Sequence, residues 1–327
     1  MPYRVPGQRR APSDRVMLSA LALAARAPSV HNSQPWRWRL DSEGLHLHAD
    51  PARLPVASSE DRELLLSCGA VLHHLRVAFA ALGWACDVHR LPDPGAPEHL
   101  AVVELAPRGA TRDEIDLVSA IARRRTDRRR YGSWEMPPGL LDVLARDATA
   151  EGAELLEVAE PAARYQLVSA IMEAEEFQDA DWELASLAGL PGAEPVGARA
   201  RTAGGADLPV REAPALGIER PVGAALDHDI STLTVLGTEA DDRLSWLRAG
   251  EAASAVLLRA TSIGLASCAL SRPLDLGETR DLVRTRILGT TGHPQLILRL
   301  GWAPPHAEPL PATQRRPLSE FVDGIPM

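Results

Sequence analysis

Hydrophobic residues recur at helical spacing in two long segments of the chain. In residues 60–82 they follow one another at intervals of three or four, and Gly83 comes directly after. Residues 241–263 repeat this pattern, and Gly264 follows. Small residues interrupt the hydrophobic positions in both segments. Each pattern predicts a long, largely buried helix that ends at a glycine.

The two segments also match each other residue by residue. A shift of 181 positions aligns, without a gap, Gly69 with Gly250, Leu75 with Val256, Leu82 with Ile263, Gly83 with Gly264 and Ala85 with Ala266. A chance match of two amphipathic helices would explain the alignment taken alone. However, a candidate strand follows each helix, and strands at 99–105 and 295–300 lie downstream of both. This order favours two related halves around a pseudo-two-fold axis, with the long helices packed together at the centre.

Shorter patterns predict the remaining elements. We expect helices at 13–27, at 140–148 and at 161–188. A further helix should begin at Thr111, which forms a capping box with Glu114. We expect strands at 36–40, 86–91, 155–158 and 232–236. Residues 189–223 are rich in proline and glycine with few large hydrophobic groups. A loop of this length in a compact domain is usually a lid or disordered.

A polar loop lies between two prolines, where the first helix gives way to a strand. Between Pro28 and Pro35 the chain reads Ser29, Val30, His31, Asn32, Ser33, Gln34. The amides of Asn32 and Gln34 offer donors and acceptors that suit the edge of a planar ligand carrying both NH groups and carbonyls. A plain turn rich in asparagine and serine explains the same residues.

Arginines are concentrated in two places on an otherwise acidic chain. Six lie within residues 123–130, and the pair Arg315 and Arg316 precedes Pro317, while the chain as a whole has a net charge of −9. Positive charge at a helix C-terminus is favoured by the helix dipole, which explains the first cluster without a ligand. Arginine is also the usual ligand of phosphate. Together with the polar loop, the two clusters suggest one phosphorylated, planar ligand.

Other patterns exclude several classes of site. The chain contains no GxGxxG after a strand, no GxxxxGK[ST] and no GxSxG, so it predicts neither a Rossmann site, a P-loop nor a serine nucleophile elbow. The pairs His46 with His48 and His73 with His74 lack carboxylate or cysteine companions at metal spacing, so we expect an exposed strand face, a helix surface and no metal site. The acidic balance argues against nucleic acid as a partner.

The cellular compartment is predicted from the cysteines and from the search for a signal peptide. Cys68, Cys86 and Cys268 form no CxxC pair, which favours a reducing compartment. We find no signal peptide and no hydrophobic run long enough to cross a bilayer, and we interpret residues 1–12 as an arm. The expectation is a cytoplasmic protein that contacts no membrane.

Five segments, taken in order, resemble the FMN-dependent nitroreductase family, and most closely its single-chain Acg-like branch. They are AARAPSVHNSQPWRWRL, RELLLSCGAVLHHLRVAFAALG, IARRRTDRRRY, WLRAGEAASAVLLRATSIGLASCALS and TQRRPLSEF, within residues 13–322. The resemblance implies an α+β fold with mixed, mainly antiparallel sheets flanked by helices. It also implies an internal pseudo-dimer: an arm at 1–12, a first half at 13–110, and a second half at 111–327 that includes the lid at 189–223.

The resemblance further implies one complete FMN site per chain. The residues expected to line the isoalloxazine ring of FMN are Pro28, Ser29, Val30, His31 and Asn32, with Gln34 nearby. The family motif for the ribityl chain and pyrimidine edge falls on Arg124, Arg125, Thr126 and Arg128, and the C-terminal phosphate ligands fall on Arg315 and Arg316, followed by Pro317. Gly264, Leu265 and Ala266 match the segment that approaches the ring from the second half. No catalytic side chain is assigned, because the chemistry takes place at N5 of the flavin.

The resemblance implies hydride transfer from NAD(P)H, as a transient donor, through FMN to a nitroaromatic or quinone acceptor. The main alternative is a protein that binds and sequesters FMN under a closed lid, with little or no turnover. A nucleic-acid binder built on the arginines is a third interpretation, which would show salt-sensitive binding. We expect a monomer with an internal pseudo-dimer, and further dimerisation stays open.

Overall fold

The computed structural model describes residues 11–54, 61–129, 131–132, 134–172, 231–289, 292–303 and 305–325. The expected lid at 189–223 lies outside the described residues. So do residues 1–10 of the expected arm and the end of the helix expected at 161–188, which is helical over 161–172.

The helices follow the hydrophobic pattern closely, except the one at residues 277–286, which the pattern did not predict. They are α1 (Asp14–Ala24), α2 (Asp61–Ala81), α3 (Arg112–Arg123), α4 (Pro138–Ala150), α6 (Arg243–Ser262) and α7 (Gly277–Arg286). The capping box is confirmed, since Thr111 Oγ1 accepts from the Glu114 backbone N–H and the Glu114 carboxylate accepts from that of Thr111. Helix α1 ends three residues earlier than expected, because the backbone closes in a turn in which Ala27 N–H donates to Ala24.

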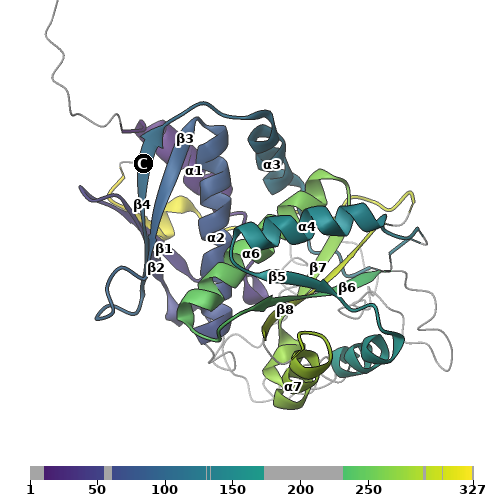
Figure 1. The fold of residues 1–327 in the computed structure, drawn as a ribbon. Helices are drawn as coiled ribbons and strands as arrows, with labels where there is room; N and C mark the ends of the chain where they lie inside the picture. Colours follow the sequence, from purple (N-terminus) through teal and green to yellow (C-terminus); the bar gives the residue numbers. More distant parts are fainter. Residues whose placement is uncertain are drawn as a thin grey trace, which may run out of the picture.

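The strands form two sheets (Figure 1). Sheet A has the order β3 (Trp84–Arg90), β4 (His99–Pro107), β2 (Leu45–Ala49), β1 (Trp36–Leu40) and β9 (Val322–Asp323). Sheet B has the order β5 (Glu154–Glu157), β6 (Thr232–Thr238), β8 (His293–Gly301) and β7 (Ala266–Leu270). All pairings are antiparallel except that of β1 with β9. The expected α+β fold with mixed, mainly antiparallel sheets is confirmed.

The C-terminal tail returns to sheet A. Strand β9 runs parallel to β1, and Trp38 N–H donates to the carbonyl of Phe321 at 2.7 Å. A boundary at residue 110 therefore leaves one strand of sheet A in the second half. This return also carries Arg315 and Arg316 to the polar loop that precedes β1.

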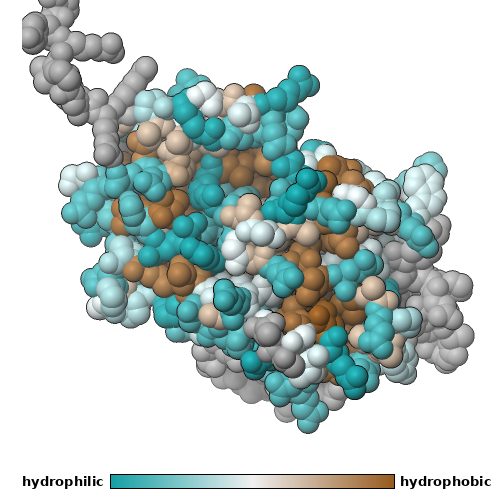
Figure 2. Space-filling model, viewed as in Figure 1, coloured by the Kyte–Doolittle hydropathy of each residue, from teal (hydrophilic) through white to brown (hydrophobic). Residues whose placement is uncertain are grey.

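Each sheet covers a hydrophobic core of its own. Trp36, Trp38 and Leu47 of sheet A are fully buried against α1 and α2. Sheet B packs on α4 and α6 with one face and on α7 and the 161–172 helix with the other. On the face shown in Figure 2, hydrophobic residues reach the surface between α4 and α7, over sheet B, while polar residues cover much of the remainder.

Helices α2 and α6 cross at the centre of the molecule, between the two sheets, as expected (Figure 1). The crossing depends on two glycines that the 181-residue shift aligns. A Cβ on Gly69 would lie 2.0 Å from the carbonyl oxygen of Leu247, and one on Gly250 would lie 2.1 Å from that of Leu66. The same shift relates Leu66 to Leu247. The two glycine contacts are therefore related by the same shift of 181 residues.

Substitution of Gly69 by alanine is expected to lower the free energy of unfolding by about 1–3 kcal/mol, because the added methyl overlaps backbone that moves only if the helices separate. Gly139 in α4 is the matched control, since a Cβ there meets nothing within 4 Å. Gly139→Ala should be neutral or slightly stabilising. Urea unfolding of both variants checks this. Equal stability of Gly69→Ala and wild type would show that the two helices can move apart at the crossing without loss of stability.

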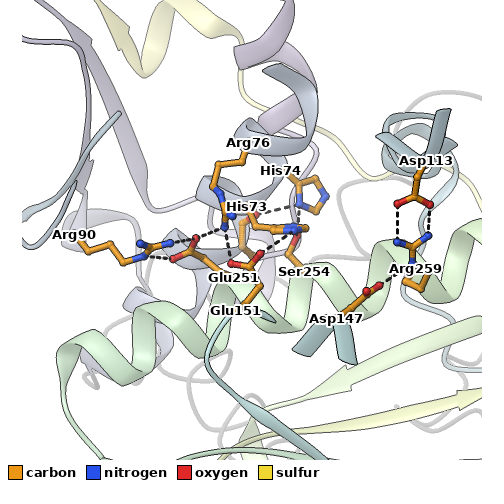
Figure 3. A network of polar contacts seen from close by, with 11 residues as sticks. His73, His74, Arg76, Arg90, Asp113, Asp147, Glu151, Glu251, Ser254 and Arg259 are labelled. Carbon is orange, nitrogen blue, oxygen red and sulfur yellow. Dashed lines mark hydrogen bonds and ion pairs between the residues drawn. The ribbon is translucent and has the colours of Figure 1, made fainter. Parts of the chain in front are cut away.

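The prediction that His73 and His74 lie on a helix surface is wrong. Both are buried at the α2–α6 crossing, and Nδ1 of each lies 2.7 Å from Ser254 Oγ (Figure 3). Burial lowers the pKa of His73 to about 4 and that of His74 well below its ordinary value. The pattern misled because their hydrophobic neighbours continue around almost the whole helix, so polar residues do not mark its exposed side.

The prediction that His46 and His48 lie on an exposed strand face without a carboxylate companion is wrong for His46. His46 is buried, and its Nε2 lies 2.9 Å from Asp41 Oδ1, so it does have a carboxylate companion. His48 is partly buried beside it.

Among the described residues, one helix is by length and composition hydrophobic enough to cross a membrane, although the sequence analysis found no such segment. It is α2, and 89% of its most hydrophobic window is buried inside the molecule. Its composition is explained by its position between the two sheets, where protein surrounds it on nearly every side.

Candidate functional site

The polar loop between α1 and β1 adopts an uncommon backbone conformation. His31, Asn32 and Gln34 have φ of 48°, 54° and 52°, in the left-handed region that non-glycine residues seldom occupy. Ser29 Oγ accepts from the Gln34 N–H at 3.0 Å, and the Val30 N–H donates to Ser67 Oγ on α2 at 3.1 Å. The surrounding structure thus holds the loop in a strained shape, as is typical of ligand-binding segments.

The C-terminal tail locks this loop from outside. Asn32 Nδ2 donates to the carbonyl of Gln314 at 3.0 Å, and its Oδ1 accepts from Arg315 Nη1 at 2.9 Å. Gln34 Oε1 accepts from the Arg316 N–H at 2.9 Å, and its Nε2 donates to the carbonyl of Asn32 at 3.2 Å. Both amides therefore position the tail and the loop against each other.

Four arginines meet at a small pocket beside the loop. Arg124 and Arg125 come from the end of α3, Arg315 from the tail and Arg26 from the turn after α1; Ile121, Ala312 and Thr313 complete the lining. No carboxylate lines the pocket, and the described residues place none within ion-pair distance of these four guanidinium groups. The pocket therefore gathers positive charge from three distant parts of the chain.

Helix ends help to hold this charge. Arg125 Nη1 donates to the carbonyls of Ala122 and Arg124 at 2.9 and 2.8 Å, and Arg26 Nη2 donates to that of Ala122 at 3.3 Å. These carbonyls lie at the C-terminus of α3, where the helix dipole favours cations. The dipole of α3 does not fully compensate the positive charge of the four guanidinium groups. Burial and the neighbouring arginines lower the pKa of Arg124 and of Arg315 to about 10.

Three of the arginines that line the pocket have buried hydrogen-bond donors without a partner in the described part of the chain. Nε of Arg26, of Arg124 and of Arg315 are buried and have no partner among the described residues. An unpaired buried N–H is costly and an anion would satisfy it. The donor set and the excess of charge both fit a phosphate group.

Other predicted site residues lie away from the pocket lining. Arg316 is turned inward, where its guanidinium donates to the carbonyls of Gln34 at 2.9 Å and Glu320 at 3.0 Å, so it braces the loop. Arg128 is exposed. Pro28 precedes the strained segment, and Pro317 begins the short helical turn Leu318–Glu320.

The second half approaches through the end of α6. Gly264 has a φ of +91°, which requires glycine, and an added Cβ there would meet only Trp302, at 3.8 Å. Leu265 is buried and Ala266 begins β7. The next residue, Ser267, forms a parallel bridge with Thr126, so this segment lies beside the arginine motif.

Comparison with known proteins assigns the chain to a family. A family model described as "Nitroreductase family" matches residues 121–302. The chain belongs to the nitroreductase family. The match begins at Ile121, three residues before Arg124, so the model covers the arginine motif and the second half up to the end of sheet B.

Two Mycobacterium tuberculosis relatives match nearly the whole chain. "Putative NAD(P)H nitroreductase Rv3131" is 41% identical over 319 residues, which cover 95% of this chain and 92% of that protein. "Putative NAD(P)H nitroreductase acg" is 39% identical over 325 residues, with 93% and 94% covered. Among solved structures, a nitroreductase with bound FMN from Bacteroides fragilis is 18% identical, with a TM-score of 0.37. The match covers 61% of this chain and 94% of that chain. Membership makes this protein an oxidoreductase, of the Acg-like kind.

Arg26, which lines the pocket, and His74, which lies near it, were not predicted from the sequence as site residues. Arg26 stands alone after α1, and only the fold brings it to Arg124. Burial lowers the pKa of His74 on α2, and Arg124 and Arg315 lower it further; its buried Nε2 has no hydrogen-bond partner among the described residues. A lone arginine and a histidine within a hydrophobic helix carry no pattern that distinguishes them.

Proposed function

We propose that this protein is an FMN-dependent NAD(P)H nitroreductase whose four-arginine pocket binds the FMN phosphate. The observation that carries this proposal is the pocket of Arg26, Arg124, Arg125 and Arg315, with three unpaired Nε donors and no carboxylate. Phosphate matches both the charge and the donors. When bound, FMN would supply the redox chemistry, accepting hydride from NAD(P)H and passing it to a nitroaromatic or quinone.

The chain's own residues would place the cofactor. Arg315 links the phosphate pocket to the loop through Asn32, so anchoring the phosphate would also fix Asn32 and its neighbours Pro28 to His31 beside the ring. Thr126 and the segment from Gly264 to Ala266 lie next to each other and would border the ring from the second half. Gly264 lets backbone approach there because no side chain intervenes.

Steady-state oxidation of NADH and NADPH, with nitrofurazone or menadione as acceptor, tests the activity. We expect a yellow protein whose rate depends on the acceptor. A yellow protein with no acceptor-dependent rate would instead favour the alternative, sequestration of FMN. A preparation that stays colourless after incubation with FMN would contradict both.

We further propose that residues 13–110 and 111–327 are two related halves, which together make one complete site in a cytoplasmic monomer. Only the second half carries the arginine motif, and only the first carries the polar loop. We therefore expect one FMN per chain of 35.2 kDa, measured by absorbance after acid release together with light scattering. Two FMN per chain would contradict the single-site arrangement.

A further inference from the structure

Three histidines meet on the outer face of sheet A. Trp38 and Leu47 point into the core, so the alternate positions on β1 and β2 point to the opposite face. His46 and His48 occupy such positions on β2, two residues apart. His99 at the start of β4 is the ladder partner of His48, and one ring nitrogen from each of the three histidines lies within 4.8 Å of the other two.

A β-bulge creates this cluster. The register of β2 with β4 pairs Leu47 with Ala101 and then His48 with His99, so Leu100 is the extra residue on β4. In a regular ladder His48 would face Leu100, whose side chain is fully buried. The bulge therefore brings His99 opposite His48 on the outer face. Bulges often redirect a side chain in this way at functional sites.

The three imidazoles already contact one another. His46 Nδ1 lies 3.0 Å from His99 Nε2, and the rings of His48 and His99 stack with their centroids 4.6 Å apart. Burial, followed by the neighbouring histidines, lowers the pKa of His48, and burial, followed by His46, lowers that of His99.

A carboxylate fixes the orientation of one ring. Asp41 Oδ1 lies 2.9 Å from His46 Nε2, and the backbone N–H of Glu43 leads the contacts that lower the pKa of Asp41. The contact with Asp41 occupies Nε2 of His46, while Nδ1 of the same ring faces Nε2 of His99. A carboxylate that orients a histidine in this way is the usual outer partner of a metal ligand.

We propose that His46, His48 and His99 bind a divalent transition-metal ion, best matched by Zn²⁺, and that Asp41 positions His46. Three imidazoles are a zinc-binding set that leaves a fourth position for water. Zn–N distances of about 2.0–2.1 Å place tetrahedral ligands roughly 3.4 Å apart, so small side-chain rotations close the site. His99 then presents its Nε2 lone pair to the ion in place of the hydrogen bond to His46.

Neighbouring charges set the strength of this site. Arg37 and Arg39 on β1 face His48 and His46 across the ladder and oppose a cation. Asp41 and Asp93 act on His99 with the opposite sign. The arginines are exposed, so solvent and salt screen them. We therefore expect binding weaker than in structural zinc sites but specific to the three histidines.

Zinc titration of the full-length, tag-free protein after removal of metal by chelation tests the site, with calorimetry or a competing chromogenic chelator as readout. His48→Gln and His99→Gln should each weaken binding at least tenfold, and Asp41→Asn about 10–100-fold. His89→Gln is the matched control, because His89 is an exposed strand histidine of sheet A whose partner is Glu104 at 3.5 Å. We expect one zinc ion per chain for wild type and control.

Thermal unfolding gives an independent readout. Zinc should raise the melting temperature of wild type and His89→Gln but not that of His99→Gln, because ligand that binds only the native state stabilises it. FMN binding should be unchanged in every variant, since none of these residues lines the arginine pocket. Zinc binding by His99→Gln equal to that of His89→Gln, or no zinc binding by wild type, would overturn the proposal.

Discussion

Replacing Arg124 by methionine is expected to weaken FMN binding about a hundredfold, a loss of about 3 kcal/mol, because it removes one buried partner of the proposed phosphate pair. Methionine keeps the length and most of the volume of the side chain, so the pocket should keep its shape. FMN titration followed by flavin fluorescence measures the change. The matched control is Arg123→Met, one residue earlier, where the side chain is exposed in the last turn of α3.

The same substitution should have the opposite effect on the protein without FMN. Arg124 is buried among Arg26, Arg125 and Arg315, which together with burial lower its pKa to about 10. Removal of its charge relieves this repulsion, so FMN-free Arg124→Met should be at least as stable as wild type in urea unfolding. A structural arginine would behave differently, with lower stability in both states. Unchanged FMN affinity in Arg124→Met, or an equal loss in Arg123→Met, would contradict a phosphate site here.

Local patterns predicted the parts of this fold that depend on local physics. Helices α2 and α6 begin and end within two residues of the expected bounds, since each has continuous hydrophobic periodicity and a glycine after its end. The capping box at Thr111 depends on side chains three residues apart. By contrast, α7 was not expected, because most of its side chains are charged or polar and few are buried.

The candidate site was predictable only where its residues lie in distinctive motifs. Asn32, Arg124 and Arg315 were each chosen from sequence, and the structure places Arg315 in contact with Asn32 and in one pocket with Arg124. Arg316 was chosen on equal grounds, yet it is turned toward backbone carbonyls. The orientation of a side chain depends on which strand its segment joins, and the pairing of β9 with β1 involves residues nearly three hundred positions apart.

The histidine cluster is a second case in which the sequence alone did not predict a contact between distant residues. His46 and His48 lie two residues apart, so the sequence reveals that they share a face. His99 joins them because one register shift in β4 moves it opposite His48. Nothing in the residues around Leu100 indicates that shift, and without it the sequence interpretation of two isolated histidines was reasonable.

Substitution of Glu251 by glutamine is expected to lower the free energy of unfolding by about 3–5 kcal/mol, the cost of removing one partner from a buried ion pair. Glu251 on α6 is fully buried and accepts hydrogen bonds from Arg76 on α2 and Arg90 on β3 at 2.6–2.8 Å (Figure 3). Arg76 also pairs with Glu151 at 2.5 Å, so it keeps one carboxylate in the variant. Arg90 loses its only ion pair among the described residues while its side chain stays largely covered.

Asp113→Asn provides the matched control, since Asp113 receives two hydrogen bonds from Arg259 at 2.7 and 2.9 Å in the same forked geometry. That carboxylate is 60% exposed, so its loss should cost about 0–1 kcal/mol. Both changes are nearly isosteric and leave no cavity, so the difference in urea unfolding isolates the effect of burial. Glu251 joins α6 to α2 and β3, and its loss should therefore loosen the packing of α6 against these two elements. Equal stability losses in the two variants would show that water reaches the central network and that this contact depends on hydrophobic packing alone.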